Sequence, residues 1–183
     1  SEWGAEGDVD FSAAWFNLIG CGFLVRRDVL VQTGGYDEDF GLYYNDLEFA
    51  LRILAFGRAI LYDRLAVVDH RCVRSPASPL KHRLMLRNFP LLLRAHFTGW
   101  RRLDLALGHL AIALWRAARD RQLPAALRGL AESLHASSSR PFLRAPESAP
   151  GVRRFLHRYS LAKKILRRPA PTGAEPGPGF AAA

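Results

Sequence analysis

The spacing of apolar residues changes near Pro76 and Pro79, and this change limits what the chain can fold into. Before it, short apolar runs alternate with glycine-containing turns, a texture typical of α/β proteins. After it, leucines recur three or four residues apart, beginning with Leu103 and Leu107, which is the spacing of one helix face. The sequence therefore predicts an α/β part followed by a helical part.

Charge divides the chain at nearly the same place. Residues 1–70 carry five Arg and twelve Asp or Glu, a net charge of −7, whereas residues 71–183 carry 21 Lys or Arg and five Asp or Glu, a net charge of +16. Such a split favours regions with different tasks. We expect a partial α/β domain at 1–79, an amphipathic helical extension at 80–135, and a basic linker, short helix and disordered tail at 136–183.

Local patterns predict the elements within these regions. Short apolar runs indicate strands at 23–25, 59–62 and 66–68. Helical periodicity and stop signals indicate helices at 26–32, from Asn45 or Asp46 to Gly57, at 81–97 with a kink or break at Pro90, from about Leu103 to the arginines near 116–121, at 124–135, and at 152–168. Residues 137–150 are rich in serine and proline and read as a linker, and 169–183 as a disordered tail.

Composition excludes two classes of protein. The two cysteines, Cys21 and Cys72, cannot form a disulfide framework and lack the spacing of a metal site. The longest uncharged run among the helical segments, Leu105–Trp115, is shorter than the roughly 20 apolar residues of a membrane span. No signal peptide is recognised after Ser1, so we expect a cytoplasmic protein, processed or part of a longer one, that can lie peripherally on the inner face of the membrane.

Four short motifs lie in order between Gly20 and His70. They are GCGFLVRRD at 20–28, GGYDEDF at 34–40, YYNDLEF at 43–49 and VVDH at 67–70. Their order and spacing resemble the second half of family-two glycosyltransferases, and within that family the rhamnosyltransferase-like enzymes that build bacterial surface polysaccharides. The resemblance covers roughly residues 10–97. It implies a partial GT-A domain, the nucleotide-diphospho-sugar transferase fold, and transfer of a sugar with inversion.

The third motif contains the residue that the resemblance identifies as catalytic. The family usually reads Glu-Asp-x-Asp here, and its first Asp, which is Asp46 in this chain, acts as the base that deprotonates the acceptor hydroxyl. A carboxylate suits this task because the proton leaves only as the acceptor oxygen attacks. Asn45 and Glu48 depart from the family pattern but leave the base in place. The alternative for Asp46 is a helix N-cap, and both roles can hold together.

The resemblance also implies an acceptor side. Gly20, Cys21 and Gly22 would lie beside the acceptor, because small residues let the backbone approach a sugar closely. Asn45 and Glu48 are expected on the same side. The alternatives are a tight turn at the glycines and a structural role for Cys21, which has no second Cys or His nearby in sequence to activate it.

A donor and metal site is the third implication. His70 would contact Mg²⁺ or Mn²⁺, since imidazole can ligate such ions among oxygens, and Arg71 and Arg74 would donate to the donor diphosphate. The alternatives are a structural histidine and solvated arginines. Asp8 and Asp10 spell the Asp-x-Asp metal motif of the family, but they lie too close to the first motif and we interpret them as loop acids.

The expected partners follow from these assignments. They are a nucleotide-sugar donor and a glycan or lipid-linked acceptor. The family binds the donor with residues that precede the matching segment, so we expect this chain alone to be inactive. The alternative function is a non-catalytic module that binds a glycan or a membrane.

Arginine and tryptophan flank the predicted amphipathic helices, as at Trp100-Arg101 and Trp115-Arg116. This arrangement suits a helix that lies on an anionic membrane surface. The alternative is a helical cap whose apolar face packs on the rest of the protein while its arginines are solvated. The positive charge also attracts nucleic acid, but the absence of a nucleic-acid motif and the scattering of the basic residues disfavour that partner.

Overall fold

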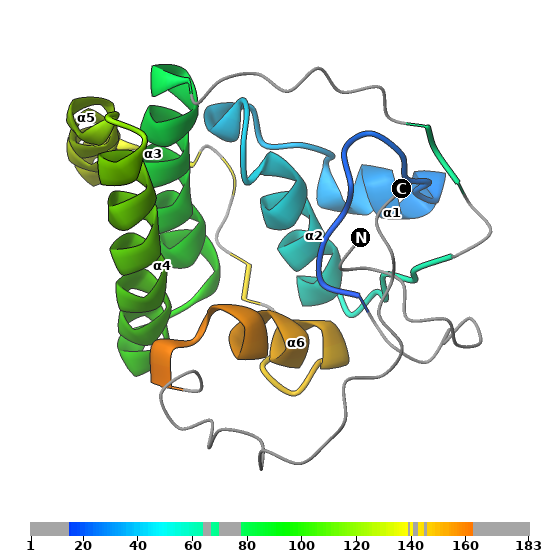
Figure 1. Cartoon of the computed structure of the whole chain (residues 1–183). Helices are drawn as coiled ribbons and strands as arrows, with labels where there is room; N and C mark the ends of the chain where they lie inside the picture. Colours follow the sequence, from blue (N-terminus) through cyan, green and yellow to red (C-terminus); the bar gives the residue numbers. More distant parts are fainter. Residues whose placement is uncertain are drawn as a thin grey trace, which may run out of the picture.

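Helices and loops form the described part of the chain, which comprises residues 15–63, 67–69, 78–138, 140, 143–144 and 146–162 of the computed structural model (Figure 1). In chain order the elements are α1 (Arg27–Thr33), the 3₁₀ helix η1 (Glu38–Phe40), α2 (Asn45–Ala55), α3 (Pro79–His96), α4 (Gly99–Arg119), α5 (Leu123–His135) and α6 (Pro150–Tyr159). The helices α1 and α2 lie on one side of the molecule and α3, α4 and α5 on the other, with α6 below them (Figure 1).

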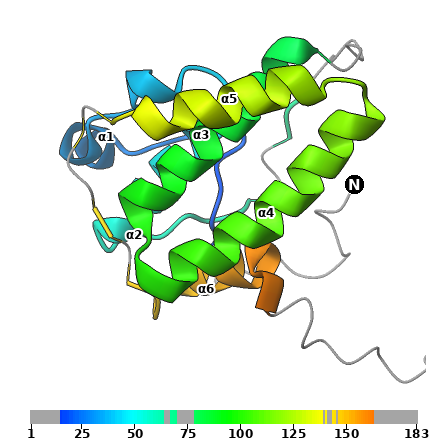
Figure 2. The same ribbon diagram turned by 90° about the vertical axis from the view of Figure 1, so that its left-hand side faces the viewer.

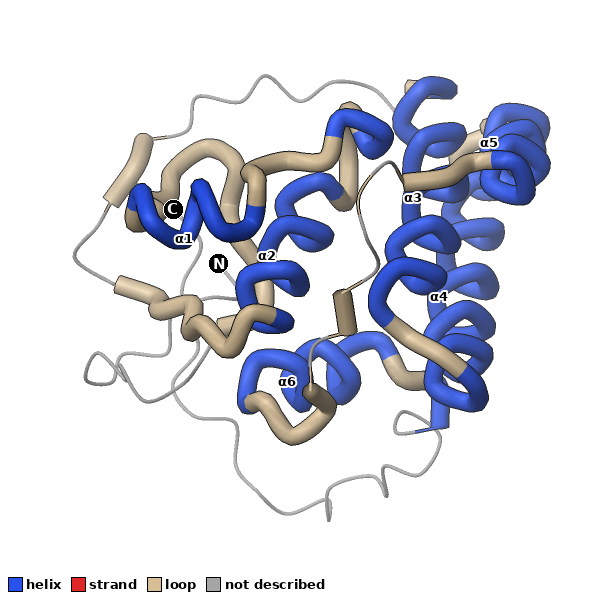
Figure 3. Tube along the Cα trace, turned by 180° about the vertical axis from the view of Figure 1, so that it is seen from behind, coloured by secondary structure: helices blue, strands red, loops and turns tan. Residues whose placement is uncertain are grey.

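The predicted α/β class, a partial GT-A sheet, is wrong for these residues. No strand occurs in the described ranges (Figure 3). The segments 23–25 and 59–62 have no regular secondary structure, and residue 66 of the third expected strand lies outside the described residues. Within the described residues, the fold that positions the candidate site is therefore a set of packed helices.

The expected sheet does not form because its short segments have too few neighbours to pair with. The backbone N–H of Trp15 donates to the carbonyl oxygen of Ile60 over 2.6 Å, but no ladder continues from this bond among the described residues. Short apolar segments gain few ladder hydrogen bonds, and isolated strand pairs are marginal in water. The expected strand residues Leu24, Leu61 and Val67 are accordingly 99 %, 55 % and 84 % exposed.

The helices expected before the change in texture are confirmed. The first, α1, ends at Gly34, whose φ of 77° lies in the left-handed region that glycine adopts without strain, and whose N–H donates to the carbonyl oxygen of Leu30. The second, α2, begins at Asn45 as expected and ends at Ala55, two residues before Gly57.

The later helices are also found near their expected positions. Helix α3 runs unbroken through Pro90, so the expected break does not occur. Helix α5 has Pro124 in its first turn, where the missing N–H costs no helical hydrogen bond. Helix α6 begins at Pro150, and the expected continuation to 168 and the tail at 169–183 lie outside the described residues.

One hydrophobic core joins regions that the sequence had separated. Phe49 from α2, Phe89 from α3, Leu105 from α4 and Phe155 from α6 are each at most 1 % exposed and belong to the same cluster. Burying one such side chain contributes roughly 1.5–3 kcal/mol. The expected boundaries near residues 79 and 135 therefore do not divide the packing, and the C-terminal helix α6 is part of the core.

A smaller cluster joins α3, α4 and α5 through Leu86, Ala117 and Ala126. Helices α3 and α5 approach closely at Gly129, because a Cβ atom there would collide with the backbone carbonyl of Arg83. Glycine at this point lets the two backbones meet.

Helix α4 turns a long apolar face outward. Its buried positions are Asp104, Leu105, Gly108 and Ala117, whereas Leu103 and Leu107 are 49 % and 46 % exposed. The expected leucine face therefore does not pack inward along its whole length. Among the described helices, none has the length and apolar composition that crossing a membrane requires.

Candidate functional site

The loop between α1 and α2 carries the candidate site and is held from α3. The Nδ2 atom of Asn88, a fully buried side chain, lies 2.6 Å from the carbonyl oxygen of Phe40, 2.8 Å from that of Leu42 and 2.9 Å from that of Tyr43. Arg87 donates from Nη1 to the Asn88 Oδ1 atom over 2.8 Å. These contacts engage one buried and two partly buried carbonyl groups and fix the backbone that leads into α2.

The last two residues of this loop have an unusual backbone conformation. Tyr43 and Tyr44 have φ angles of 66° and 63°, a region that costs non-glycine residues energy. The Asn88 amide holds the carbonyl of Tyr43, and the Tyr44 hydroxyl lies 3.0 Å from Nε2 of His109 on α4. Contacts from two other helices therefore maintain the strained entry into α2.

Asp46 lies in the first turn of α2 with its carboxylate turned toward two earlier segments. The Tyr36 hydroxyl donates to Oδ1 of Asp46 over 2.6 Å. Oδ2 of Asp46 faces Gly20, where a Cβ atom would come within 2.7 Å of it. Oδ2 accepts no side-chain hydrogen bond from a described residue, so one oxygen is held by Tyr36 and the other faces an exposed glycine turn.

The N-cap alternative for Asp46 is not what the structure has. The N-cap of α2 is Tyr44, and no side chain caps this helix end. The carboxylate of Asp46 instead accepts a hydrogen bond from Tyr36. Its place in the first turn of α2 leaves it near the positive end of the helix dipole.

Tyr36 remains a donor at ordinary pH. Burial raises the pKa of its phenol well above the usual value, and the hydrogen bond and negative charge of Asp46 raise it further. A protonated phenol can only hold Asp46 by donating, so the contact fixes the orientation of the carboxylate.

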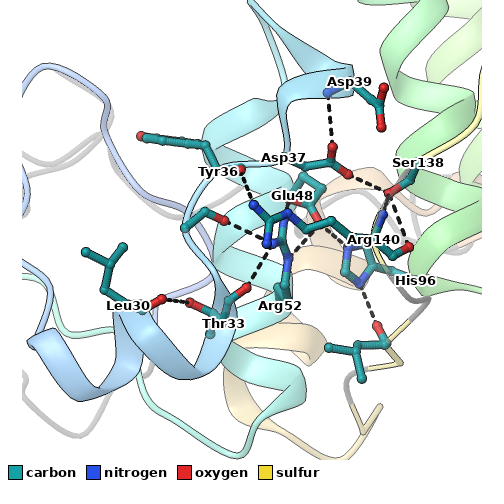
Figure 4. A network of polar contacts seen from close by, with 12 residues as sticks. Leu30, Thr33, Tyr36, Asp37, Asp39, Glu48, Arg52, His96, Ser138 and Arg140 are labelled. Atoms are coloured by element: carbon teal, nitrogen blue, oxygen red, sulfur yellow. Dashed lines mark hydrogen bonds and ion pairs between the residues drawn. The ribbon is translucent and has the colours of Figure 1, made fainter.

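A buried ion cluster, which begins two residues after Asp46, supports the same helix (Figure 4). Glu48 on α2 is 4 % exposed and forms an ion pair with Arg52 and a contact of 3.3 Å with Nε2 of His96 on α3. Arg52 also donates from Nη1 to the carbonyl oxygens of Thr33 and Gly35 over 3.0 and 2.9 Å. The cluster ties α2 to α3 and to the end of α1.

The partners of Glu48 favour the charged form of its carboxyl group. Burial alone raises the pKa of its carboxyl group, but the hydrogen bonds from His96 and Arg52 and their positive charges outweigh burial, so the pKa lies below its usual value. Both carboxylate oxygens are engaged inside the protein. Glu48 therefore positions α2, and its carboxylate does not reach the surface where an acceptor was expected to meet it.

The expected serine- and proline-rich linker packs against the site. The Ser138 hydroxyl donates to Oδ2 of Asp37 over 2.5 Å, and Nη2 of Arg140 donates to the carbonyl oxygen of Tyr36 over 3.0 Å (Figure 4). The ring Nδ1 of His96 lies 2.8 Å from the carbonyl oxygen of Leu143. The described residues of this segment thus fix the backbone around Tyr36.

The structure brings together part of the residue set expected from the sequence. Gly20 and Asp46 are in contact, and Cys21 is exposed in the same turn. Gly22 is exposed beside Val68, whose side chain occupies the space a Cβ atom would need. Asn45 is half-buried at the first position of α2. His70, Arg71, Arg74, Asp8 and Asp10 lie outside the described residues.

Sequence reasoning missed the residues that hold Asp46 and its loop. Tyr36 stands in the second motif, and its spacing of ten residues from Asp46 gives no periodic signal. Asn88 is a polar residue inside an otherwise apolar helix face, which is the one pattern that could have marked it as a buried hydrogen-bonding group. Ser138 and Arg140 come from a segment whose composition suggested only a linker.

A metal centre does not fit the described residues. Among them, no group of three or more His, Cys, Asp or Glu side chains is arranged to hold an ion. The expected ligand His70 lies outside these ranges. The geometry of the described residues therefore supports no step that runs through Mg²⁺ or Mn²⁺.

The family resemblance rests on the sequence motifs alone. No protein-family model, no curated protein sequence and no solved structure matches this chain. The geometry adds one element to the motifs: residues from the first, second and third of them, Gly20, Tyr36 and Asp46, meet at one point.

Proposed function

We propose that this chain contributes the acceptor side of a glycosyl-transfer site, with Asp46 as general base. The observation that carries the proposal is the Asp46 carboxylate, held at Oδ1 by Tyr36 and facing the exposed turn at Gly20 with Oδ2. The donor is a nucleotide sugar, and the acceptor is a hydroxyl group of a glycan or a lipid-linked glycan. The order of the four motifs supports this choice of substrates.

The proposed reaction is a single displacement at the anomeric carbon. The acceptor oxygen attacks that carbon, the bond between the carbon and the diphosphate oxygen breaks, and the nucleoside diphosphate leaves with the bonding electrons. The acceptor proton moves to Oδ2 of Asp46 as the new bond forms. Attack opposite to the leaving group inverts the anomeric configuration, so one carboxylate suffices.

The other residues of the site have positioning roles in this proposal. Tyr36 holds the carboxylate in one orientation, and the missing side chain of Gly20 lets Oδ2 lie against the exposed turn. The buried Glu48 cluster and Asn88 fix α2 and the loop before it. Such preorganisation is what a base needs to lie within hydrogen-bond distance of its proton.

An Asp46→Asn variant of the intact protein tests the proposal. Asparagine keeps the shape of the side chain and can still bind Tyr36, but it cannot accept a proton. We expect the release of nucleoside diphosphate from nucleotide sugars, measured with acceptor present, to fall by about 10²–10⁴-fold while donor binding is retained.

Asp28→Asn is the matched control, because Asp28 is an exposed acid in the first turn of α1 whose partner is the exposed Arg26. We expect this control to leave turnover unchanged. Unchanged turnover in Asp46→Asn would refute the assignment of the base. Equal loss in both variants would also count against it, because the effect would then follow charge rather than the site.

A second function, attachment to an anionic membrane surface, is favoured by the outward face of α4. Positions 100, 103, 107, 111, 114 and 118 follow one side of this helix, and none of them is charged. Trp100 and Trp115 are 65 % and 61 % exposed. Tryptophan at the border of an apolar stripe is typical of helices that lie in the lipid interface.

The neighbouring helix extends this surface. Leu123, Leu127 and Leu134 of α5 are 39 %, 49 % and 75 % exposed and follow one side of that helix. Helices α4 and α5 form the outer layer on one side of the molecule (Figure 2). Exposed arginines of α4, including Arg102 and Arg119, would attract anionic lipids. Such attachment would keep the protein at the cytoplasmic face, near lipid-linked acceptors.

Co-sedimentation with vesicles tests the membrane function. We expect the protein to bind vesicles that contain phosphatidylserine more strongly than phosphatidylcholine vesicles, and to release them as salt rises. A Leu103→Gln/Leu107→Gln variant should lose this binding. Leu24→Gln/Val31→Gln, which removes two other exposed apolar side chains, is the control. Equal effects of the two double variants would contradict a specific role for α4.

A further inference from the structure

A cavity of about 750 Å³ lies between α3, α4 and α6, separate from the Asp46 site. Its lining includes Lys81 and Leu86 from α3, Ile112 and Arg116 from α4, and Tyr159 at the end of α6, but not Gly20, Tyr36 or Asp46. Figure 2 shows these three helices. Small-molecule sites in proteins commonly enclose about 300–1,000 Å³. The cavity is therefore large enough for a ligand with both a polar and an apolar part.

The charged groups on its wall leave positive charge uncompensated. The acidic side chain among them is Asp120, and its Oδ1 accepts from Nε of Arg119 over 3.1 Å while its Oδ2 lies 3.2 Å from Nε2 of His82. Asp120 is thus already engaged. Lys81 and Arg116 form no side-chain hydrogen bond or ion pair with a described residue.

The remaining wall is aromatic and apolar. Tyr44 and Tyr159 line one side, and burial raises the pKa of both phenols, so each stays a neutral hydroxyl group. The ring of His109 stacks on Phe89, with centroids 3.7 Å apart. Trp115 lines the cavity beside Arg119, whose guanidinium carbon lies 5.3 Å from the centre of the indole ring.

These features select a class of ligand. A group with two negative charges matches the uncommitted cations of Lys81 and Arg116, and phosphate oxygens accept charge-assisted hydrogen bonds from both types of side chain. A carrier that is aromatic or aliphatic matches Leu86, Ile112 and Tyr159. An uncharged apolar ligand would make no charge-assisted contact with these two exposed cations.

We propose that this cavity binds an organic phosphate, with the phosphate at Lys81 and Arg116 and the apolar carrier against Leu86, Ile112 and Tyr159. The inference does not depend on glycosyl transfer at Asp46. Its second consequence concerns Tyr44, which lines the cavity, contacts His109 and precedes Asp46 by two residues. A ligand in the cavity would stabilise the strained entry into α2.

Calorimetric titration of the whole chain with 1-naphthyl phosphate tests the site. 1-Naphthol, which lacks the phosphate, and inorganic phosphate, which lacks the carrier, are the ligand controls. We expect 1-naphthyl phosphate to bind more tightly than either. A Lys81→Gln/Arg116→Gln variant should weaken its binding by about tenfold or more. Arg27→Gln/Arg153→Gln removes the same charge from exposed positions of α1 and α6 outside the cavity and should leave binding unchanged.

An Ile112→Trp variant fills the cavity without changing charge and should also abolish binding. Circular dichroism confirms that each variant keeps its helices. Binding that Ile112→Trp leaves intact would refute the cavity as the site. Equal weakening by the two charge variants, or equal affinity for 1-naphthol, would refute recognition of phosphate.

Vesicles that contain phosphatidic acid distinguish the two sources of an organic phosphate. If Lys81→Gln/Arg116→Gln weakens binding to these vesicles as well as to 1-naphthyl phosphate, while Arg27→Gln/Arg153→Gln does not, the cavity accepts a lipid headgroup. If the loss is confined to 1-naphthyl phosphate, the ligand is a soluble phosphate ester. Both results support the cavity as the binding site. If Lys81→Gln/Arg116→Gln weakens binding neither to 1-naphthyl phosphate nor to the vesicles, the proposal is overturned.

Discussion

The side-chain amide of Asn88 lies 2.9 Å from the carbonyl oxygen of Tyr43, 45 residues earlier in the chain. The same amide reaches two more carbonyl groups of the loop before α2. One buried polar side chain of α3 therefore fixes the segment that presents Asp46, and this relationship leads to the first prediction.

Replacing Asn88 by alanine should destabilise the protein by about 1–3 kcal/mol, because one buried and two partly buried carbonyl groups would lose their donor. Urea unfolding measures the change. Asn45→Ala, at a half-buried position with no side-chain hydrogen bond to a described residue, is the control and should cost less. If the two variants unfold at the same urea concentration, the loop is held by other contacts.

Gly20→Ala should disturb the candidate site without unfolding the protein. The new Cβ atom would lie 2.7 Å from Oδ2 of Asp46, so the carboxylate must move away from its contact with Tyr36. We expect glycosyl-transfer activity to fall, while the free energy of unfolding changes by less than about 1 kcal/mol, because Gly20 is exposed. Cys21→Ala, in the same exposed turn, should leave both quantities unchanged; a similar fall in its activity would contradict this account.

The Glu48 cluster predicts how stability depends on pH. Its carboxyl group has a lower pKa in the folded protein than in the unfolded chain, because His96 and Arg52 hold the charged form against the effect of burial. The stabilisation is therefore complete above the unfolded pKa of glutamate, about 4.3, and is lost as pH falls through the lower folded pKa. Urea unfolding between pH 7 and pH 3 measures this loss.

Two conservative variants test whether Glu48, rather than another acid, controls how stability depends on pH. Glu48→Gln should reduce stability at pH 7, since it leaves the buried Arg52 without its charge partner, and should flatten the acid dependence. Glu38→Gln changes an exposed acid and should leave the wild-type dependence in place. An unchanged slope in Glu48→Gln would show that other carboxyl groups control acid unfolding.

Gly129→Ala should destabilise the protein, although the helix propensity of alanine is about 1 kcal/mol more favourable than that of glycine. The added methyl group would collide with the backbone carbonyl of Arg83, and helices α3 and α5 would have to separate. Thermal unfolding should show a lower midpoint. Ala131→Gly, at an exposed position of the same helix, should cost only the difference in helix propensity. A higher midpoint for Gly129→Ala would mean that the two helices can move apart freely.

Helix positions could be predicted from the sequence because they depend on local signals. The periodic apolar residues of α2, the glycine after α1 and the proline in the first turn of α5 each act within a few residues of their own position. The same locality explains the wrong prediction of strands. Apolar runs such as 23–25 specify only a tendency, and a strand needs partners that its own sequence does not contain.

Part of the candidate site was also accessible from the sequence. The motifs indicated Gly20 and Asp46 as neighbours of one site, and the two are in contact. Tyr36, Asn88 and Ser138 were not indicated, because each acts across a distance in the chain that no local pattern records. The expected contact of Glu48 with an acceptor did not account for His96, a residue of α3 that draws the carboxylate into the interior.

The order of residues alone was enough to place the helices, to divide the charge and to supply the side chains available for chemistry. Packing in three dimensions then selected which faces are buried, made α6 part of the core, turned the leucine face of α4 outward and brought Asp46 to Tyr36. The two kinds of information differ because propensity and capping act between near neighbours in the chain. Burial and hydrogen-bond partnership depend on which distant segments meet, and that choice minimises the free energy of the whole molecule.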